Sequence, residues 1–165
     1  MAKSIRKKFV RSDAPPGQMR IQPRDVAILR DLASFRFLNT EQVLSLHPGG
    51  RRNILQRLSW LYHSGFVERP ESQKHIDLPS GYLVYALGRK GAELAFAENR
   101  SLQTWSRLNA KISSPNLAHA LMISQFRAVL TLALQKKGGT ISRWFQGYDL
   151  KDELTIKGKT PAVVP

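Results

Sequence analysis

A single basic segment limits what this chain can fold into more than any other stretch. Residues 51–65 contain no acidic side chain and directly follow a Pro48-Gly49-Gly50 turn. Apolar side chains recur through the segment at the spacing of an amphipathic helix with one buried stripe. These apolar positions are Ile54, Leu55, Leu58, Leu61 and Tyr62. We therefore expect a helix that starts after the turn and ends at Gly65, a residue suited to closing a helix in the left-handed conformation.

The other face of this expected helix carries arginine and amide side chains. Arginine matches the edge of guanine in the DNA major groove, and asparagine or glutamine matches adenine. The candidates for such contacts are Arg51, Arg52, Asn53, Gln56 and Arg57. The same arginines also suit contacts to phosphates alone, so base contacts and phosphate contacts both remain open.

Two helical patterns precede the basic segment. The first begins at Pro23, a favoured first helical residue, and the second follows Asn39 or Thr40, which suit the capping position. The second pattern stops at His47, directly before the turn. A helix, a tight turn and a basic helix form the order of a helix-turn-helix, whose second helix enters DNA.

Two short apolar runs, 66–69 and 82–87, come next and predict strands joined by a polar loop. A further helix is expected from Arg89 to about Asn99. This order predicts a mainly α fold with a small β-wing, that is, an α+β winged helix-turn-helix domain over residues 21–100.

The polar loop between the two expected strands would form the tip of the wing. The wing carries the cationic or titratable side chains Arg69, at the end of the first strand, and Lys74 and His75, in the loop. We expect all three to contact the DNA backbone or the minor groove. Glu71 and Asp77 dilute that charge, so a solvated loop without a DNA contact fits the same composition.

Charge is the outlier in the composition of the 165 residues. There are 26 lysines and arginines against 12 aspartates and glutamates, which gives a formal net charge of +14. Such an excess favours a polyanionic partner, because each neutralised phosphate releases condensed counterions. Together with the helix-turn-helix pattern, the charge predicts double-stranded DNA as the partner.

Several other classes of function find no support in the sequence. The absence of cysteine excludes disulfides, thiolate nucleophiles and cysteine-based zinc sites. No phosphate-binding glycine loop of the Walker type and no spacing typical of a catalytic triad is present. The first ten residues lack the apolar core of a secretory signal, and no apolar run approaches about 20 residues. We expect no catalysis, metal, cofactor or membrane partner, and a bacterial cytoplasmic location on nucleoid or plasmid DNA.

Residues 1–20 form a basic arm that ends in a Pro-Pro-Gly stretch, which disfavours regular structure. We expect the arm to be flexible. It could act as a solubilising tail, or it could follow the DNA backbone or enter a minor groove, as other basic arms do. The candidate DNA contacts of the arm are Lys3, Arg6, Lys7, Lys8 and Arg11.

The C-terminal third begins with an expected linker over residues 101–115. A long helix then runs from Leu117 to Lys137, with Asn116 as its cap, and its apolar residues cover more than one face. This helix could form a homodimer, which would place half-sites about one DNA turn apart, or it could pack only on its own domain. An expected strand over 140–145 and an apolar run at 162–164 suggest that residues 116–165 also start a further domain.

The sequence resembles the replication-relaxation family of plasmids and other mobile elements. The matching pieces are residues 24–29, 37–43, 58–67, 85–91 and 117–121, which together span roughly residues 22–130. The resemblance implies a winged helix-turn-helix DNA-binding protein linked to plasmid replication, relaxosome or conjugative-transfer functions. It also implies a relaxase or a replication protein as a partner.

The functional expectation is a sequence-specific DNA-binding accessory factor of a mobile element. A winged-helix transcriptional repressor or antirepressor is the first alternative. A DNA-nicking nuclease fragment that uses Asp149, Asp152 and Glu153 to hold Mg²⁺ is the second, although a solvated turn explains the same three carboxylates. A protein-interaction module on the same fold is the third.

Overall fold

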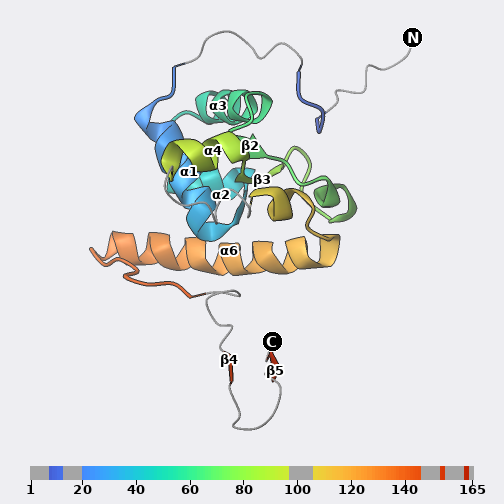
Figure 1. The fold of residues 1–165 in the computed structure, drawn as a ribbon. Helices are drawn as coiled ribbons and strands as arrows, with labels where there is room; N and C mark the ends of the chain where they lie inside the picture. The colour runs from blue at the N-terminus through green and yellow to red at the C-terminus, as the bar shows by residue number, and fades with distance from the viewer. Residues whose placement is uncertain (1–7, 13–19, 97–105, 146–152, 155–161, 164–165) are drawn as a thin grey trace. The chain divides into compact units, whose positions relative to one another are not determined.

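The computed structural model describes residues 8–12, 20–96, 106–145, 153–154 and 162–163. The chain divides into two compact units, residues 1–129 and residues 130–165. The first unit is mainly helical with a small three-stranded antiparallel sheet (Figure 1), in agreement with the predicted α+β class.

Three helices begin where the sequence predicts them. Helix α1 spans Pro23–Phe35, α2 spans Thr40–Leu46 and α3 spans Arg51–His63. Asn39 caps α2 through its side chain, which accepts a hydrogen bond from the backbone N–H of Gln42 at 2.9 Å. Such a cap satisfies backbone groups that a helix end leaves open, which explains why the start of α2 was predictable.

The sheet places its strands in the order β1-β3-β2. Strand β1 (Phe37–Asn39) was not predicted, whereas β2 (Val67–Glu68) and β3 (Val84–Leu87) lie within the two predicted runs. Alternate residues face opposite sides of a strand. Leu38 and Tyr85 therefore join the core formed with α1, α2 and α3, while Phe37, Val84 and Ala86 pack with residues of the long helix α6.

Helix α4 spans Arg89–Ala95 and is therefore shorter than the predicted helix, which was expected to reach about Asn99. A side chain at Gly91 would place a Cβ 2.2 Å from the carbonyl oxygen of Phe66, so only glycine permits this close approach. The contact holds α4 against the start of β2.

The loop between β2 and β3 folds back on the sheet instead of forming a plain hairpin tip. It contains a 3₁₀ helix, η1 (Glu71–His75), within which Gln73 is buried. The Gln73 side chain accepts a hydrogen bond from the Val84 N–H and donates to the Val84 and Pro70 carbonyls. Continuing the β2–β3 register places Pro70 opposite Val84, and proline has no N–H to donate. The Gln73 amide thus supplies the missing donor.

Helix α6 spans Ser114–Lys136, so Asn116 lies inside the helix and the predicted cap is wrong. Residues 106–110, within the predicted linker over 101–115, are also helical. Helix α6 buries a stripe formed by Leu117, Leu121, Ser124 and Ala128. The Ser124 hydroxyl donates to the carbonyl oxygen of Phe37 at 2.7 Å, which ties α6 to β1.

The opposite face of α6 is apolar and exposed. Met122, Phe126 and Val129 are 71%, 65% and 55% exposed. Among the described helices, α6 is also the one whose length and apolar composition could cross a membrane, a test that core helices of soluble proteins pass as well. The expectations of a homodimer through this helix and of no membrane partner both remain predictions.

The second unit contains little regular structure after α6. Residues 140–145 form no strand, so the predicted strand there is wrong. Strand β4 (Glu153–Leu154) pairs antiparallel with β5 (Ala162–Val163), which falls in the predicted apolar run.

Candidate nucleic-acid interface

The outward face of α3 is polar in its first two turns. Arg52, Asn53 and Gln56 are all exposed, as the helical spacing predicts. Arg51 is exposed as well, but its guanidinium lies 2.6 Å from a carboxylate oxygen of Glu41 on α2. The first half of α3 therefore presents two amide side chains and two guanidinium groups to solvent.

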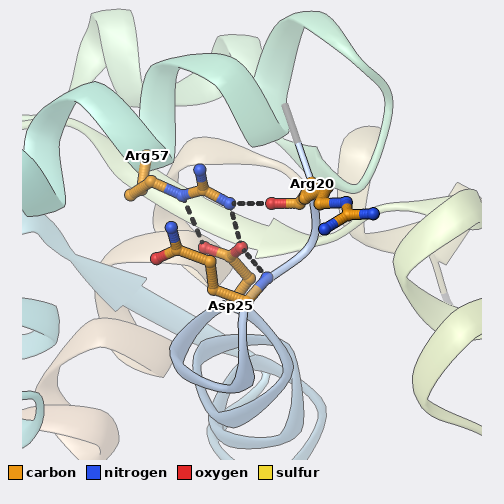
Figure 2. Close-up of polar contacts among 4 residues, drawn as sticks. Arg20, Asp25 and Arg57 are labelled. Atoms are coloured by element: carbon orange, nitrogen blue, oxygen red, sulfur yellow. Dashed lines mark hydrogen bonds and ion pairs between the residues drawn. The ribbon is translucent and has the colours of Figure 1, made fainter. Parts of the chain in front are cut away.

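Arg57 does not belong to this exposed face, and the expectation that it faces outward is wrong. Its guanidinium is buried against Asp25 at the start of α1, whose side chain is fully buried (Figure 2). The Nε donates to one carboxylate oxygen at 2.9 Å, and Nη2 donates to the other. Nη2 also donates to the backbone carbonyl of Arg20 at 2.9 Å. Arg57 is therefore part of the core of the domain.

The Asp25–Arg57 pair joins three segments of chain. Asp25 also accepts a hydrogen bond at 2.7 Å from the backbone N–H of Gln22, so its carboxylate completes the capping box of α1. The Arg57 guanidinium lies over the ring of Trp60, which is buried. A bidentate pair of this kind fixes geometry as well as charge. It holds α3 against α1 and fixes which side of α3 faces solvent.

Arg24 is an exposed cation beside α3 that the sequence did not single out. A Cβ at Gly49, in the turn before α3, would lie 3.0 Å from an Arg24 guanidinium nitrogen. Arg24 therefore rests on the turn, close to the start of α3, while its neighbour Asp25 is buried. Arg24 and Gly49 lie far apart in the sequence, so the folded structure is what brings them together.

The three residues predicted to contact DNA from the wing differ in their exposure and in their partners. Arg69 lies over the rings of Tyr62 and Tyr85, with its guanidinium carbon 4.1 Å and 5.4 Å from the ring centroids. Arg69 is therefore half-buried beside β2, and its predicted DNA contact stays a prediction. Lys74 pairs with Glu71 at 3.2 Å, and His75 is exposed at the end of η1.

The described part of the N-terminal arm is docked rather than loose. The Arg11 guanidinium pairs with Glu68 at 2.6 Å, and its Nε donates to the Tyr62 carbonyl oxygen at 2.9 Å. Residues 8–12 of the arm therefore contact the domain, while the flexibility of the arm stays a prediction. Lys8 is exposed. The other three predicted arm contacts, Lys3, Arg6 and Lys7, lie outside the described residues.

Burial shifts the pKa of three rings around this docked segment. Burial raises the pKa of Tyr62 and of Tyr85, and the positive charge of Arg69 partly opposes both shifts. The pKa of His63 is lowered, first by burial and then by the charges of Arg69 and Arg11. His63 is therefore held neutral, in the form whose Nδ1 can accept a hydrogen bond.

Within the part of the chain that the structure describes, no three histidine, aspartate or glutamate side chains gather to hold a metal ion. Asp149 and Asp152, two of the three carboxylates considered for a nuclease, lie outside the described residues. The first half of α3 is a polar helix face on a compact support.

The replication-relaxation family model matches residues 29–156, most of the chain. This protein therefore belongs to the replication-relaxation family, as the sequence motifs predicted. Membership indicates a role in the replication or relaxation of mobile DNA elements. No curated protein matches the sequence, and no solved structure does.

Proposed function

We propose that this protein binds double-stranded DNA through the first half of α3, as an accessory factor in plasmid or mobile-element replication or conjugative DNA processing. The observation that carries the proposal is the joint exposure of Arg52, Asn53 and Gln56 on one helix face directly after a tight turn. These side chains match guanine and adenine edges in a groove that admits a helix.

The arrangement of elements supports a winged-helix reading of the fold. The order α1-β1-α2-α3-β2-β3, with β3 between β1 and β2, is the order of a winged helix-turn-helix. Here the wing is compact, because η1 and Gln73 hold the loop on the sheet. We therefore assign base contacts to α3, and to the wing only a flanking contact through Lys74 or His75.

The charge of the chain supports a nucleic-acid partner. The formal net charge is +14, and Arg24 and Arg52 place exposed guanidinium groups beside the turn before α3. Cations that flank a recognition helix contact phosphates and fix its register on the duplex. We further propose a replication protein or a relaxase as a partner of the DNA-bound protein.

Salt-dependent affinity tests this proposal. The probe is a mixed-sequence duplex of about 25 base pairs, titrated by fluorescence anisotropy at several salt concentrations. For about six phosphate contacts, log K should fall against log salt with a slope near −5. The absence of duplex binding at low salt, or an affinity independent of salt, would overturn the proposal.

Arg24→Ala provides the residue-level test of the phosphate contacts. It should weaken binding about equally on all duplexes and make the slope shallower by about 1. Arg30→Ala removes the same charge from another exposed position of α1 and serves as the matched control. Equal effects from the two variants would show that the loss is one of net charge alone.

Selection of bound duplexes from a random pool tests sequence specificity, and footprinting locates the enriched site. Protection at an origin of replication or transfer supports an accessory factor. Protection that overlaps a promoter supports the transcriptional regulator instead.

A further inference from the structure

Glu41 on α2 and Arg51 at the first position of α3 form an ion pair between the two helices. Arg51 Nη1 lies 2.6 Å from Glu41 Oε1, and the side chains of Arg51 and Glu41 are 57% and 35% exposed. The Oε1 atom itself is covered from solvent. The Glu41 carboxylate therefore contacts the Arg51 guanidinium, while much of the Arg51 side chain still faces solvent.

The backbone around Glu41 is held on both sides. The hydroxyl of the buried Thr40 accepts a hydrogen bond from the Leu83 backbone N–H at 3.0 Å. The amide of the buried Gln42 donates to the Gln125 side chain on α6 at 2.9 Å. Glu41 thus projects from a fixed part of the fold, and a side chain on a rigid element can orient a flexible partner.

The first turn of α3 carries cations where helix stability favours acidic side chains. Arg51 and Arg52 occupy its first two positions, and this turn contains no acidic residue. The N-terminus of a helix has a partial positive charge, so a cation in this turn is unfavourable for the helix. The Glu41 carboxylate compensates the charge of Arg51 from a neighbouring helix. Helix stability therefore does not explain why an arginine stands at position 51.

A carboxylate beside an arginine changes which DNA groups the arginine favours. The Glu41 carboxylate repels a phosphate, because both are negatively charged. The guanine edge carries no charge and offers two acceptors, O6 and N7, to a bidentate arginine. A guanidinium has five N–H donors in a rigid fork, so the pair with Glu41 leaves donors for such a contact. The pair therefore favours a base edge over a phosphate as the ligand of Arg51.

We propose that Glu41 is a positioning residue that holds the Arg51 guanidinium for a guanine edge in the major groove, which makes Arg51 a determinant of sequence specificity. The inference rests on the proposed DNA binding through α3. A side chain that is held before binding loses less conformational entropy when its contact forms. Arg51 is thereby distinguished from a cation that only contacts phosphates.

The ratio of affinities for the selected duplex and a scrambled duplex tests this role. Glu41→Gln keeps the size of the side chain and removes its charge. Glu93→Gln makes the same change in an exposed carboxylate paired with Arg89 on α4 and is the matched control. Glu41→Gln should lower the ratio about fivefold, the effect of losing one exposed ion pair, and Glu93→Gln should leave it unchanged. An unchanged ratio in Glu41→Gln would overturn the inference.

A double-mutant cycle with Arg51→Ala shows whether Glu41 acts through Arg51. In the Arg51→Ala chain no guanidinium remains to be positioned, so adding Glu41→Gln should not change the affinity ratio. A further fall in the ratio would overturn the inference, because Glu41 would then act on another part of the domain.

Thermal unfolding followed by circular dichroism separates positioning from a general effect on the fold. Glu41→Gln should move the unfolding midpoint by no more than about 3 °C, since an exposed ion pair contributes little to stability. A lower affinity ratio together with a much larger shift of the midpoint would assign Glu41 to the stability of the domain and overturn the inference.

Replacement of single guanines in the selected duplex by 7-deazaguanine identifies the base that Arg51 contacts. This analogue lacks the N7 acceptor that a bidentate arginine uses. At one position the replacement should weaken binding by the parent several-fold, weaken binding by Glu41→Gln less, and leave binding by Arg51→Ala unchanged. The inference is overturned if every replacement affects the parent and Arg51→Ala equally.

Failure of this inference can be told apart from failure of the proposed function. If the parent binds no duplex, the DNA-binding proposal fails, and the inference fails with it. If the parent binds with the expected salt dependence but prefers no selected site, or if Glu41→Gln and Glu93→Gln behave alike, the inference alone is wrong.

Discussion

The two halves of α3 use the same residue types for different purposes. In the first half, Arg52 and Gln56 are exposed, whereas in the second half Arg57 is buried on Asp25 and His63 accepts a hydrogen bond from Ser12. Arg52 and Arg57 are indistinguishable by residue type. The difference teaches that the position of a cation relative to the buried stripe decides whether its charge serves a partner or the fold.

The sharpest way to break this comparison is to remove the buried cation. Arg57→Met leaves the fully buried Asp25 carboxylate without its partner, which should lower the free energy of unfolding by about 3–5 kcal/mol. Urea denaturation followed by circular dichroism measures the change. A loss below about 1 kcal/mol would show that Arg57 belongs with the exposed cations after all.

A double substitution separates the lost charge pair from lost packing. Asp25→Leu combined with Arg57→Met replaces the pair by apolar side chains and should recover most of the stability lost in the single variant. If the double variant is as unstable as Arg57→Met, the charge pair is not what stabilises the fold. The contacts of Arg57 with the Arg20 carbonyl and the Trp60 ring would then account for the loss.

Removal of the exposed Arg52 should affect DNA binding rather than stability, the opposite of the result expected for Arg57. Arg52→Ala should change the free energy of unfolding by no more than about 0.5 kcal/mol. Its affinity for the selected DNA site should fall by about 1–3 kcal/mol if Arg52 contacts a base bidentately. Anisotropy titrations on the selected and on a scrambled duplex measure both affinities. An equal loss on the two duplexes would assign Arg52 to phosphate contact only.

The smallest expected effect concerns pH at the end of α3. The folded pKa of His63 lies below its ordinary value of 6.5, so the undocked chain binds the proton more readily. The stabilisation is therefore present above pH 6.5 and is lost as the pH falls further, because protonated His63 cannot accept the Ser12 N–H. Trypsin cleavage after Arg11, compared at pH 7.5 and 5.5 and normalised on a peptide substrate, should accelerate at the lower pH. His63→Gln should abolish that acceleration.

The sequence predicted those elements that have local signals. Pro23 and Asn39 mark the starts of α1 and α2, and the glycine-rich turn marks the start of α3. Strand β1 was missed because three residues are too short to show a period, and its hydrogen-bond partner is the distant strand β3. The strand predicted at 140–145 is absent, because an apolar pattern does not by itself provide a second strand to pair with.

The candidate site was predictable only where exposure follows from helical spacing. Arg52, Asn53 and Gln56 lie opposite the buried stripe, so their exposure could be read from the sequence. Arg57 lies at the edge of the stripe, and only the distant Asp25 reveals its role. A signal for the pair did exist, because Asp25 is the capping-box residue of α1 and a buried carboxylate calls for a cation.

The Gln73 amide has a consequence for how the molecule meets other chains. Beyond the end of β2, the Gln73 side chain forms hydrogen bonds with the backbone N–H and carbonyl of Val84. Without Gln73 these two groups would have no strand partner on that side. An unpaired strand margin invites pairing with a foreign strand and hence aggregation. The Gln73 side chain in the 3₁₀ helix η1 thereby protects this part of β3 from pairing with a strand of another chain.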